Sequence, residues 1–203
     1  MGQPDRYADR PVTTVPAYRP PPVTGRAEAR IWSLVMRTRP ARPPTVPPLG
    51  TDIVRAERIT ASFYRYLYDT VGGPWCWTAR RLIDDDELLR RVRDPGVEID
   101  VLWAGGVPAG YVEFAADEMP AIWIAYFGLV PEFIGRRLGG RFLDWAVDRA
   151  WELGAGEVRV QTCSLDHEAA LPNYERAGFE LESARIEHVD VIEGVAVRPR
   201  SGA

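Results

Sequence analysis

Lysine is missing from this chain of 203 residues, so all 25 of its basic residues are arginines. A P-loop that binds nucleoside triphosphates needs the lysine of the motif GxxxxGK[ST], and the sequence therefore excludes it. The glycine fingerprint GxGxxG of dinucleotide-binding folds is also missing from residues 128–142, where a glycine-rich turn does occur. A phosphate bound at that turn would have to be recognised in another way.

Cysteine and histidine are scarce, and long apolar runs are missing. The two cysteines, Cys76 and Cys163, and two histidines are too few for a disulfide framework or a zinc site, so we expect no bound metal. No apolar run approaches the roughly 18 residues of a membrane span, and the N-terminus is polar and proline-rich, unlike a signal peptide. The net charge of −4 gives no basic footprint for nucleic acid. These absences predict a cytoplasmic protein that binds neither nucleic acid nor a membrane.

The residues that are present predict one globular domain with tails. The apolar fraction of 46% supports a sizeable core, and the length suits a single domain of roughly 150 residues. Residues 1–28 are rich in proline and arginine and have no period, which is typical of a flexible arm. We expect the domain to span 29–197, with a proline-rich connector at 39–50 and a tail at 198–203.

The most informative stretch is 121–151, which has the pattern of a strand, a glycine turn and a helix. Residues 122–130 form an apolar run that suits a buried strand, and Pro131 ends it. From Leu138 onward, apolar residues recur at helical spacing. The turn between them, 135–140, opens the helix with unpaired N–H groups and the positive end of the helix dipole. It therefore predicts a phosphate site.

The remaining periodic segments alternate between strands and helices. One predicted helix begins after a short strand at 52–56 and has its apolar stripe at Ile59, Phe63, Tyr66, Leu67 and Val71. A single helix links the strands at 122–130 and 157–163, so we expect these two strands to be parallel. Further strands are predicted at 29–36, 98–104, 109–114 and, as one or two, within 179–197, and further helices near 84–94 and 164–177.

Two segments resemble motifs of the GCN5-related N-acetyltransferases, the GNAT family. Leu129-Val130-Pro131 followed by residues 134–139 is similar to motif A, with Ile134 in place of Gln or Arg and Arg137 in place of the middle glycine. Residues 165–179 are similar to motif B, and match it at Ala170, Tyr174, Gly178 and Phe179. Pro172 predicts a helix that is kinked or begins near it, with Asp166 capping the preceding turn.

The resemblance implies an α/β fold of the α+β type: a mixed, mostly antiparallel central sheet flanked by helices, splayed between the central strand and the next. It implies an acetyl-CoA-dependent N-acetyltransferase that transfers the acetyl group directly to an amine of a small molecule or peptide, with acetyl-CoA as co-substrate. The residues that it assigns to the co-substrate are Leu129, Val130, Gly135, Arg136, Arg137, Leu138, Gly139, Gly140 and Arg141.

The resemblance also implies catalytic and acceptor-binding residues. Tyr174 of motif B would donate a proton to the departing thiolate. The central strand has no carboxylate, so Glu113 on the neighbouring strand is the candidate general base, with His167 as another candidate. The helices after the first strands would wall the acceptor pocket, with Tyr64, Tyr68, Trp75, Trp77, Arg80 and Arg81 as candidates to line it.

Other interpretations stay open at the level of sequence. The missing strand carboxylate is consistent with a non-catalytic acyl-CoA-binding sensor or regulatory module, and a phosphate-binding domain for another nucleotide is a third reading. Cys163 is interpreted as a small core residue and not as a nucleophile. The acceptor is undefined, and edge strands and exposed tryptophans are compatible with a homodimer.

Overall fold

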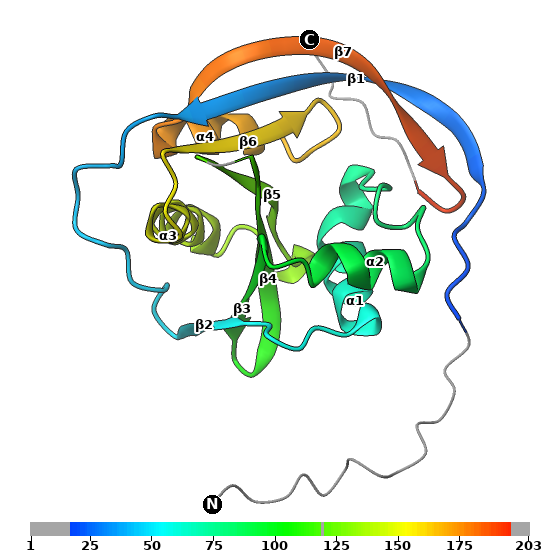
Figure 1. The fold of residues 1–203 in the computed structure, drawn as a ribbon, viewed down its shortest axis with the longest axis horizontal. Coiled ribbons are helices and arrows are strands. Elements are labelled where there is room, and N and C mark those ends of the chain that lie inside the picture. Colours follow the sequence, from blue (N-terminus) through cyan, green and yellow to red (C-terminus); the bar gives the residue numbers. More distant parts are fainter. Residues whose placement is uncertain (1–16, 119, 196–203) are drawn as a thin grey trace, which may run out of the picture.

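The computed structural model describes residues 17–118 and 120–195, which form a seven-stranded sheet with helices on both faces (Figure 1). The strand order is β2-β3-β4-β5-β6-β1-β7, and every neighbouring pair is antiparallel except β5 and β6. The predicted mixed sheet and its parallel pair are therefore confirmed. The strands are β1 (Val23–Met36), β2 (Thr51–Arg55), β3 (Val97–Ala104), β4 (Val107–Glu118), β5 (Ala121–Leu129), β6 (Glu157–Cys163) and β7 (Glu180–Ile192).

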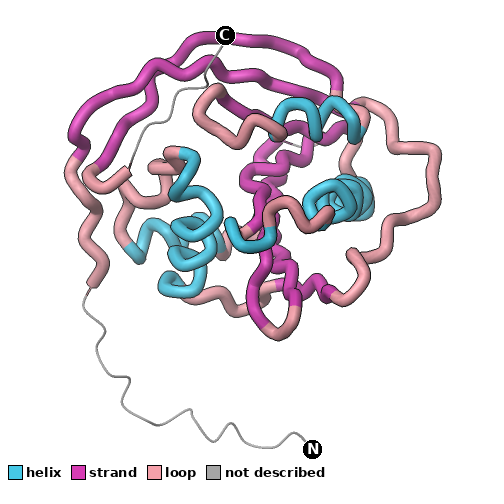
Figure 2. The backbone as a smooth tube through the Cα atoms, turned by 180° about the vertical axis from the view of Figure 1, so that it is seen from behind, coloured by secondary structure: helices cyan, strands magenta, loops and turns pink. Residues whose placement is uncertain are grey.

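Four α-helices of the described chain cover the sheet. They are α1 (Ala61–Gly72), α2 (Asp85–Val92), α3 (Leu138–Glu152) and α4 (Ala170–Ala177). Helices α1 and α2 lie on one side of β4 and β5, and α3 lies on the other side with α4 beside it (Figures 1 and 2). None of these helices is long and apolar enough to cross a membrane. The two sides have separate hydrophobic clusters, one under α3 and one under α1 and α2.

Helix α1 buries a different stripe from the predicted one. Its N-cap is Thr60, whose hydroxyl accepts a hydrogen bond from the N–H of Phe63. The buried face carries Tyr64, Leu67, Tyr68 and Val71, while Tyr66 is 47% exposed. The predicted stripe shares Leu67 and Val71 with this buried face but did not include Tyr64 and Tyr68. Burial is possible here because both hydroxyls find polar partners inside the core.

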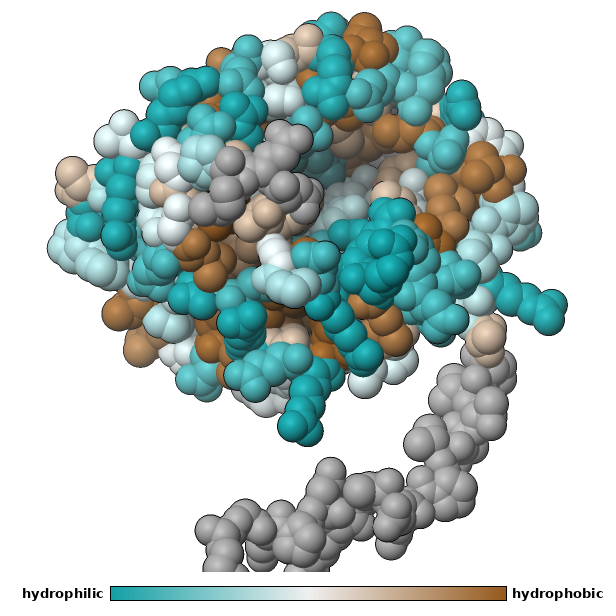
Figure 3. Space-filling model, viewed as in Figure 1, coloured by the Kyte–Doolittle hydropathy of each residue, from teal (hydrophilic) through white to brown (hydrophobic). Residues whose placement is uncertain are grey.

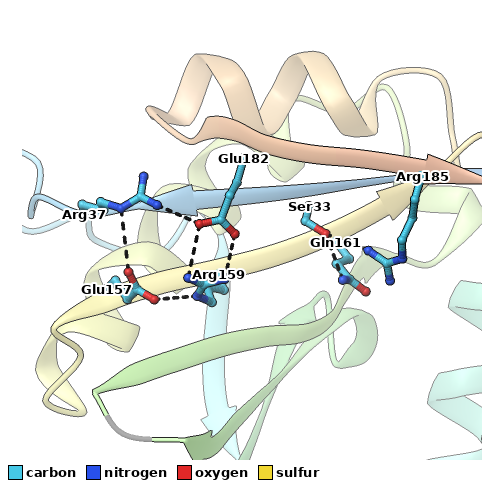
Figure 4. Close-up of polar contacts among 7 residues, drawn as sticks. All are labelled: Ser33, Arg37, Glu157, Arg159, Gln161, Glu182 and Arg185. Carbon is cyan, nitrogen blue, oxygen red and sulfur yellow. Dashed lines mark hydrogen bonds and ion pairs between the residues drawn. The ribbon is translucent and has the colours of Figure 1, made fainter.

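The N-terminal strand β1 lies between β6 and β7 and pairs with both. It begins at Val23, so the predicted flexible arm, residues 1–28, extends too far; residues 1–16 lie outside the described part. Strands β1 and β7 form a long two-stranded arch over the rest of the sheet (Figure 1). Arg37 of the segment after β1, Arg159 of β6 and Glu182 of β7 form ion pairs across these strands (Figure 4).

The sheet is splayed between its two parallel strands. Strand β5 pairs with β6 only over 121–124, whereas its pairing with β4 continues to Leu129. The second half of β5 therefore has one side of its main chain turned away from any neighbouring strand. This opening confirms the predicted splay and positions the site described below.

Two carboxylates are buried on the same face of β3. Glu98 receives hydrogen bonds from Arg149 at 2.6 and 3.1 Å and an ion pair from Arg55 at 2.8 Å. Asp100 is 4% exposed, and its Oδ2 has no hydrogen-bond partner among the described residues. Burial, and then the charge of Glu98, raise the pKa of Asp100 to about 7. Asp100 is therefore protonated in the folded protein at a pH where it is ionised in the unfolded chain.

This difference predicts a loss of stability as the pH rises from 5 to 8. The unfolded chain releases the Asp100 proton near its ordinary pKa, and the folded protein keeps it until about pH 7. The free energy of unfolding should thus fall by on the order of 1–3 kcal/mol over this interval. Glu98 does not mask the effect, because its pKa is lowered and its contribution is constant above about pH 5.

Urea titrations at pH 5 and pH 8 test this expectation. Asp100→Asn should be stabilised relative to the wild type at pH 8 and should lose the dependence, whereas Asp52→Asn, at an exposed site on β2, should keep it. An identical pH dependence in wild type and Asp100→Asn would contradict the assignment.

Candidate active site

A cavity of about 880 Å³ lies where β5 and β6 separate. Its walls come from the second half of β5, the turn 134–141, the start of α3, the end of β6, the segment 166–176 and two tryptophans that follow α1. Glycine at position 128 lets β5 pack closely against Val71 of α1, because a Cβ there would lie 2.5 Å from Val71 Cγ1. The splay therefore opens into a pocket large enough for an extended ligand.

The turn before α3 presents unused main-chain donors to this cavity. Gly135 has φ +82° and Arg137, the residue before α3, has φ +61°. Among the loop and cap hydrogen bonds of the described chain, none is donated by the N–H groups of residues 135–140. The positive end of α3 adds to these donors. The turn thus has the features of an anion site.

Most of the predicted co-substrate residues of this turn line the cavity, namely Gly135, Arg137, Gly139, Gly140 and Arg141. Arg136 and Leu138 do not. The guanidinium of Arg136 lies over the ring of Phe133 at 5.1 Å, and Leu138 packs against the core under α3. Their predicted binding role is therefore limited to main-chain N–H groups.

Val130 is a correction to the predicted pantetheine-binding pair. Its N–H donates to the carbonyl of Ala109 at 2.9 Å, and its carbonyl accepts from Phe133 at 2.9 Å, so its main chain is occupied. Leu129 lines the cavity. Because neighbouring residues of a strand point their main-chain groups to opposite sides, the groups of Leu129 point to the open side of β5.

Tyr174 of α4 lines the same cavity and is 7% exposed. Helix α4 begins at Ala170, so Pro172 lies in its first turn, where its missing N–H has no helical partner to lose. The ring contacts Phe179 edge-on, with centroids 5.9 Å apart. Burial, and then the charge of Asp166, raise the pKa of Tyr174. Its hydroxyl therefore keeps its proton over the working range of pH.

Asp166 lies in the turn before α4, and its carboxylate accepts hydrogen bonds within that turn and from Trp77. Its Oδ2 accepts from the hydroxyl of Thr162 at 2.9 Å and from the N–H of Cys163 at 2.8 Å, and its Oδ1 accepts from Trp77 Nε1 at 3.0 Å. Trp77 is thereby fixed as part of the cavity wall, and Trp75 lies beside it. Trp75 and Trp77 were predicted to line the acceptor pocket; both line this first cavity, and neither lines the second cavity described below.

Tyr64 and Tyr68, which were also predicted to line the acceptor pocket, line neither this cavity nor the second one introduced below. They are fully buried under α1 and α2. Tyr64 donates to Glu113 at 2.5 Å, and Tyr68 contacts the ring of Tyr126 edge-on at 5.1 Å. They support the pocket wall from behind because strand β5 lies between them and the cavity.

Glu113, the predicted general base, is also enclosed. It is fully buried and accepts hydrogen bonds from Tyr64 and from Arg80, the latter at 2.6 Å. It does not line a cavity. His167 has a packing and capping role, since its Nδ1 accepts from the N–H of Ala169 at 3.0 Å and its ring contacts Trp75. A base role for Glu113 remains a prediction, and its contacts suit a residue that positions Arg80.

Cys163 lies at the end of β6 and lines the first cavity. Burial, and then Asp166, raise the pKa of the Cys163 thiol to about 12, which leaves it protonated and a poor nucleophile. No group of three or more metal-ligating side chains is found in residues 17–118 and 120–195. The protonated thiol agrees with the interpretation that Cys163 is not a nucleophile.

A second cavity of about 620 Å³ lies on the other side of the splay. It shares Ile124, Ala125, Tyr126 and Gln161 with the first cavity, so the two meet between β5 and β6. Figure 3 shows this side of the molecule hollowed beneath the β1–β7 arch, with hydrophilic side chains along its lower border over α2. Two ligands that enter from opposite sides could therefore meet at the splay.

Sequence reasoning missed two polar residues of these walls. Arg176 lines the first cavity and approaches the turn, since a Cβ on Gly140 would lie 2.9 Å from its terminal nitrogen. Gln161 donates from Nε2 to Ser33 Oγ at 3.0 Å, and Arg185 holds the same oxygen at 3.1 Å (Figure 4). Arg176 lies two residues after Tyr174 in motif B, which was a usable signal. Gln161 had none, because its neighbour β1 is distant in sequence.

The fold and site define a protein with a splayed sheet and a helix start whose N–H groups are turned to a cavity without a partner in the described chain. A family model described as the Acetyltransferase (GNAT) family matches residues 59–179, more than half of the chain. The chain therefore belongs to the GNAT acetyltransferases. Membership of this family implies acyl-CoA-dependent acetyl transfer. No curated protein sequence is detectably similar to the chain.

Solved structures share the fold at low identity. A GCN5-related N-acetyltransferase from Sphaerobacter thermophilus is 18% identical with a TM-score of 0.58, over 88% of this chain and 54% of that one. Another from Kribbella flavida is 16% identical with a TM-score of 0.53, over 85% and 60%. An acetyltransferase of Bacillus subtilis in complex with CoA is 16% identical with a TM-score of 0.51, over 66% and 78%. The chain thus spans little more than half of the first two structures.

Proposed function

We propose that the protein is an acetyl-CoA-dependent N-acetyltransferase that transfers the acetyl group directly to an amine. The observation that carries this proposal is the pair of cavities that meet at the splay, one of which begins at the unused N–H groups before α3. One cavity suits the co-substrate and the other suits the acceptor. Direct transfer needs both to be filled together.

The first cavity has the donor set that the co-substrate requires. The N–H groups of 135–140 and the positive end of α3 suit a diphosphate, with Arg141 and Arg176 beside them. The open side of β5 at Leu129 suits an extended amide-containing arm, which would be held like an added strand. The acetyltransferase of Bacillus subtilis, which has a similar fold and was solved in complex with CoA, supports this assignment. Acetyl-CoA, when bound, supplies the activated acetyl group.

The residues at the meeting point suit acyl transfer. The reaction forms the C–N bond and breaks the C–S bond; the amine loses one proton and the thiolate gains one. Tyr174, protonated and lining the first cavity, holds the proton for the sulfur. Main-chain N–H groups on the open side of β5 would stabilise the developing oxyanion. The amine must arrive neutral, and Glu113 remains the proposed base, although it lines neither cavity.

The co-substrate site is tested by a charge placed in the turn. Gly139 is the second residue of α3, and a Cβ there would meet Leu129 at an ordinary 3.5 Å, so the backbone accepts a side chain. Gly139→Asp should weaken CoA binding tenfold or more in calorimetry, because its carboxylate faces the diphosphate. The same carboxylate lies at the positive end of the α3 dipole and stabilises the helix, so the free energy of unfolding should not fall.

Gly139→Asn is the matched control, since it has the same shape without the charge and should bind several times more tightly than the Asp variant. ATP and NAD serve as competing nucleotides, and the wild type should bind neither as tightly as CoA. A wild type that gives no heat with CoA or acetyl-CoA would overturn the proposal.

A second candidate function is an acyl-CoA sensor without catalysis. It is favoured by one observation: the four residues that the two cavities share, Ile124, Ala125, Tyr126 and Gln161, include no carboxylate at the point where the cavities meet. Release of CoA in the presence of a panel of amines separates the two functions. Tight binding of acetyl-CoA with no turnover on any amine would favour the sensor.

A further inference from the structure

Arginine dominates the charged part of the second cavity. Arg80, Arg90 and Arg91 line it, and Asp94 is the single carboxylate that does so among the described residues. Asp94 already accepts a hydrogen bond from the N–H of Gly96 at 2.8 Å. The wall therefore offers mainly guanidinium donors to whatever fills it.

Arg91 of α2 has the geometry of an anchor for an anion. Its Nε donates to Glu87 at 2.6 Å, which fixes the side chain, and its two terminal nitrogens make no hydrogen bond within the described chain. Glu87 also pairs with Arg90, so one carboxylate serves two guanidiniums. The free terminal nitrogens form the planar fork that binds a carboxylate or phosphate through two bonds.

Arg80 supplies a second, more deeply placed guanidinium. Its side chain is 13% exposed and is fixed by its ion pair with Glu113. Its Nε is buried and has no hydrogen-bond partner among the described residues. The guanidinium also lies 5.4 Å from the ring of Tyr126, which lines both cavities. Arg80 thus connects the charged part of the wall to the point where the cavities meet.

The polar atoms at that meeting point suit the other end of the same ligand. Gln161 uses its Nε2 for Ser33, and its amide oxygen makes no hydrogen bond within the described residues, so this oxygen can accept from an amine. Trp123 and Tyr126 form the apolar part of the wall between the amine end and the arginines.

We propose that the acceptor is an amine that also carries an anionic oxygen group, a carboxylate or a phosphate, bound by Arg91 with Arg80 behind it. This inference rests on the proposed function, because it assigns the second cavity to the acceptor. The amine of such a ligand lies towards Gln161 and the anion towards α2.

Matched pairs of amines test the charge requirement. The probes are β-alanine against β-alaninamide, glycyl-phenylalanine against its C-terminal amide, and phosphoethanolamine against ethanolamine, compared at equal concentrations of neutral amine. The anionic member of at least one pair should have a kcat/KM about tenfold higher or more, and the pair identifies carboxylate or phosphate. Saturation-transfer NMR in the presence of CoA measures binding of the same pairs without turnover.

Arg91→Gln should reduce the ratio of kcat/KM between the anionic and the neutral amine of a pair to about one, and should leave the affinity for CoA unchanged. The arginine is 47% exposed on the helix surface, so the variant should fold. Arg58→Gln, at an exposed arginine that lines neither cavity, removes the same charge and should keep the preference. Turnover without a charge preference, or a preference that survives Arg91→Gln, overturns this inference alone. Charge-selective binding without turnover supports the site but removes the proposed catalysis, and neither binding nor turnover overturns both.

Discussion

Replacing Glu113 by glutamine is expected to lower the free energy of unfolding by about 3 kcal/mol. Glu113 is fully buried between the hydroxyl of Tyr64 at 2.5 Å and the guanidinium of Arg80 at 2.6 Å. The variant leaves the Arg80 charge without its anion in a site from which water is largely excluded. Burial, and then Glu113, also raise the pKa of Tyr64, so its hydroxyl remains a donor to the glutamine. Chemical denaturation measures the loss.

The same variant decides the role of Glu113. If Glu113 only positions Arg80, the glutamine variant should unfold at a lower denaturant concentration than the wild type. The pH dependence of its kcat/KM, measured without denaturant, should be unchanged. A general base should give a loss of about 100-fold or more in rate and remove the acidic limb of the profile. Glu132→Gln, at an exposed acid beside the turn, should change neither quantity. A stability equal to that of the wild type would contradict the buried ion pair.

Replacing Tyr174 by phenylalanine is expected to lower kcat about 100-fold or more. The variant keeps the ring contact with Phe179 and removes the hydroxyl that faces the first cavity. The KM for acetyl-CoA should change little, because the turn before α3 is intact. Steady-state and single-turnover kinetics with a fixed amine measure the effect.

The pH dependence gives a second readout for Tyr174. Burial raises the pKa of this tyrosine above its ordinary value of 10, so its protonated form persists on the alkaline side. Loss of this proton should therefore cause no decrease in the wild-type rate at any pH up to about 10. Tyr66→Phe, at a 47% exposed tyrosine of α1, is the control and should be fully active. Full kcat in Tyr174→Phe would exclude the role of proton donor.

Local patterns predicted the parts of the site that depend on neighbouring residues. The strand that ends at Pro131, the turn with Gly135 and the helical spacing from Leu138 all have their causes within a few residues, and β5 and α3 confirm them. Arg137 replaced a motif glycine and has φ +61°, so the turn keeps the glycine-like conformation despite the side chain.

Sequence patterns did not predict the environment of a side chain where that environment is set by elements distant in the sequence. Periodicity could identify an apolar face on α1 but could not predict that the hydroxyls of Tyr64 and Tyr68 find buried partners. The sequence alone does not distinguish a strand glutamate that faces a cavity from one that pairs with an arginine of a distant loop. Glu113 faces Arg80, which lies 33 positions away.

The amino-acid sequence by itself determined the order of the elements, the anion-binding turn and the helix that carries Tyr174, because spacing, proline and glycine act over single turns of chain. Only the tertiary structure decided that β1 enters the sheet between β6 and β7, that Gln161 lies where the two cavities meet, and that Arg91 lines the second one. These placements depend on pairing and packing between segments that are remote in sequence. Such contacts form only when the whole sheet is assembled and its two halves separate.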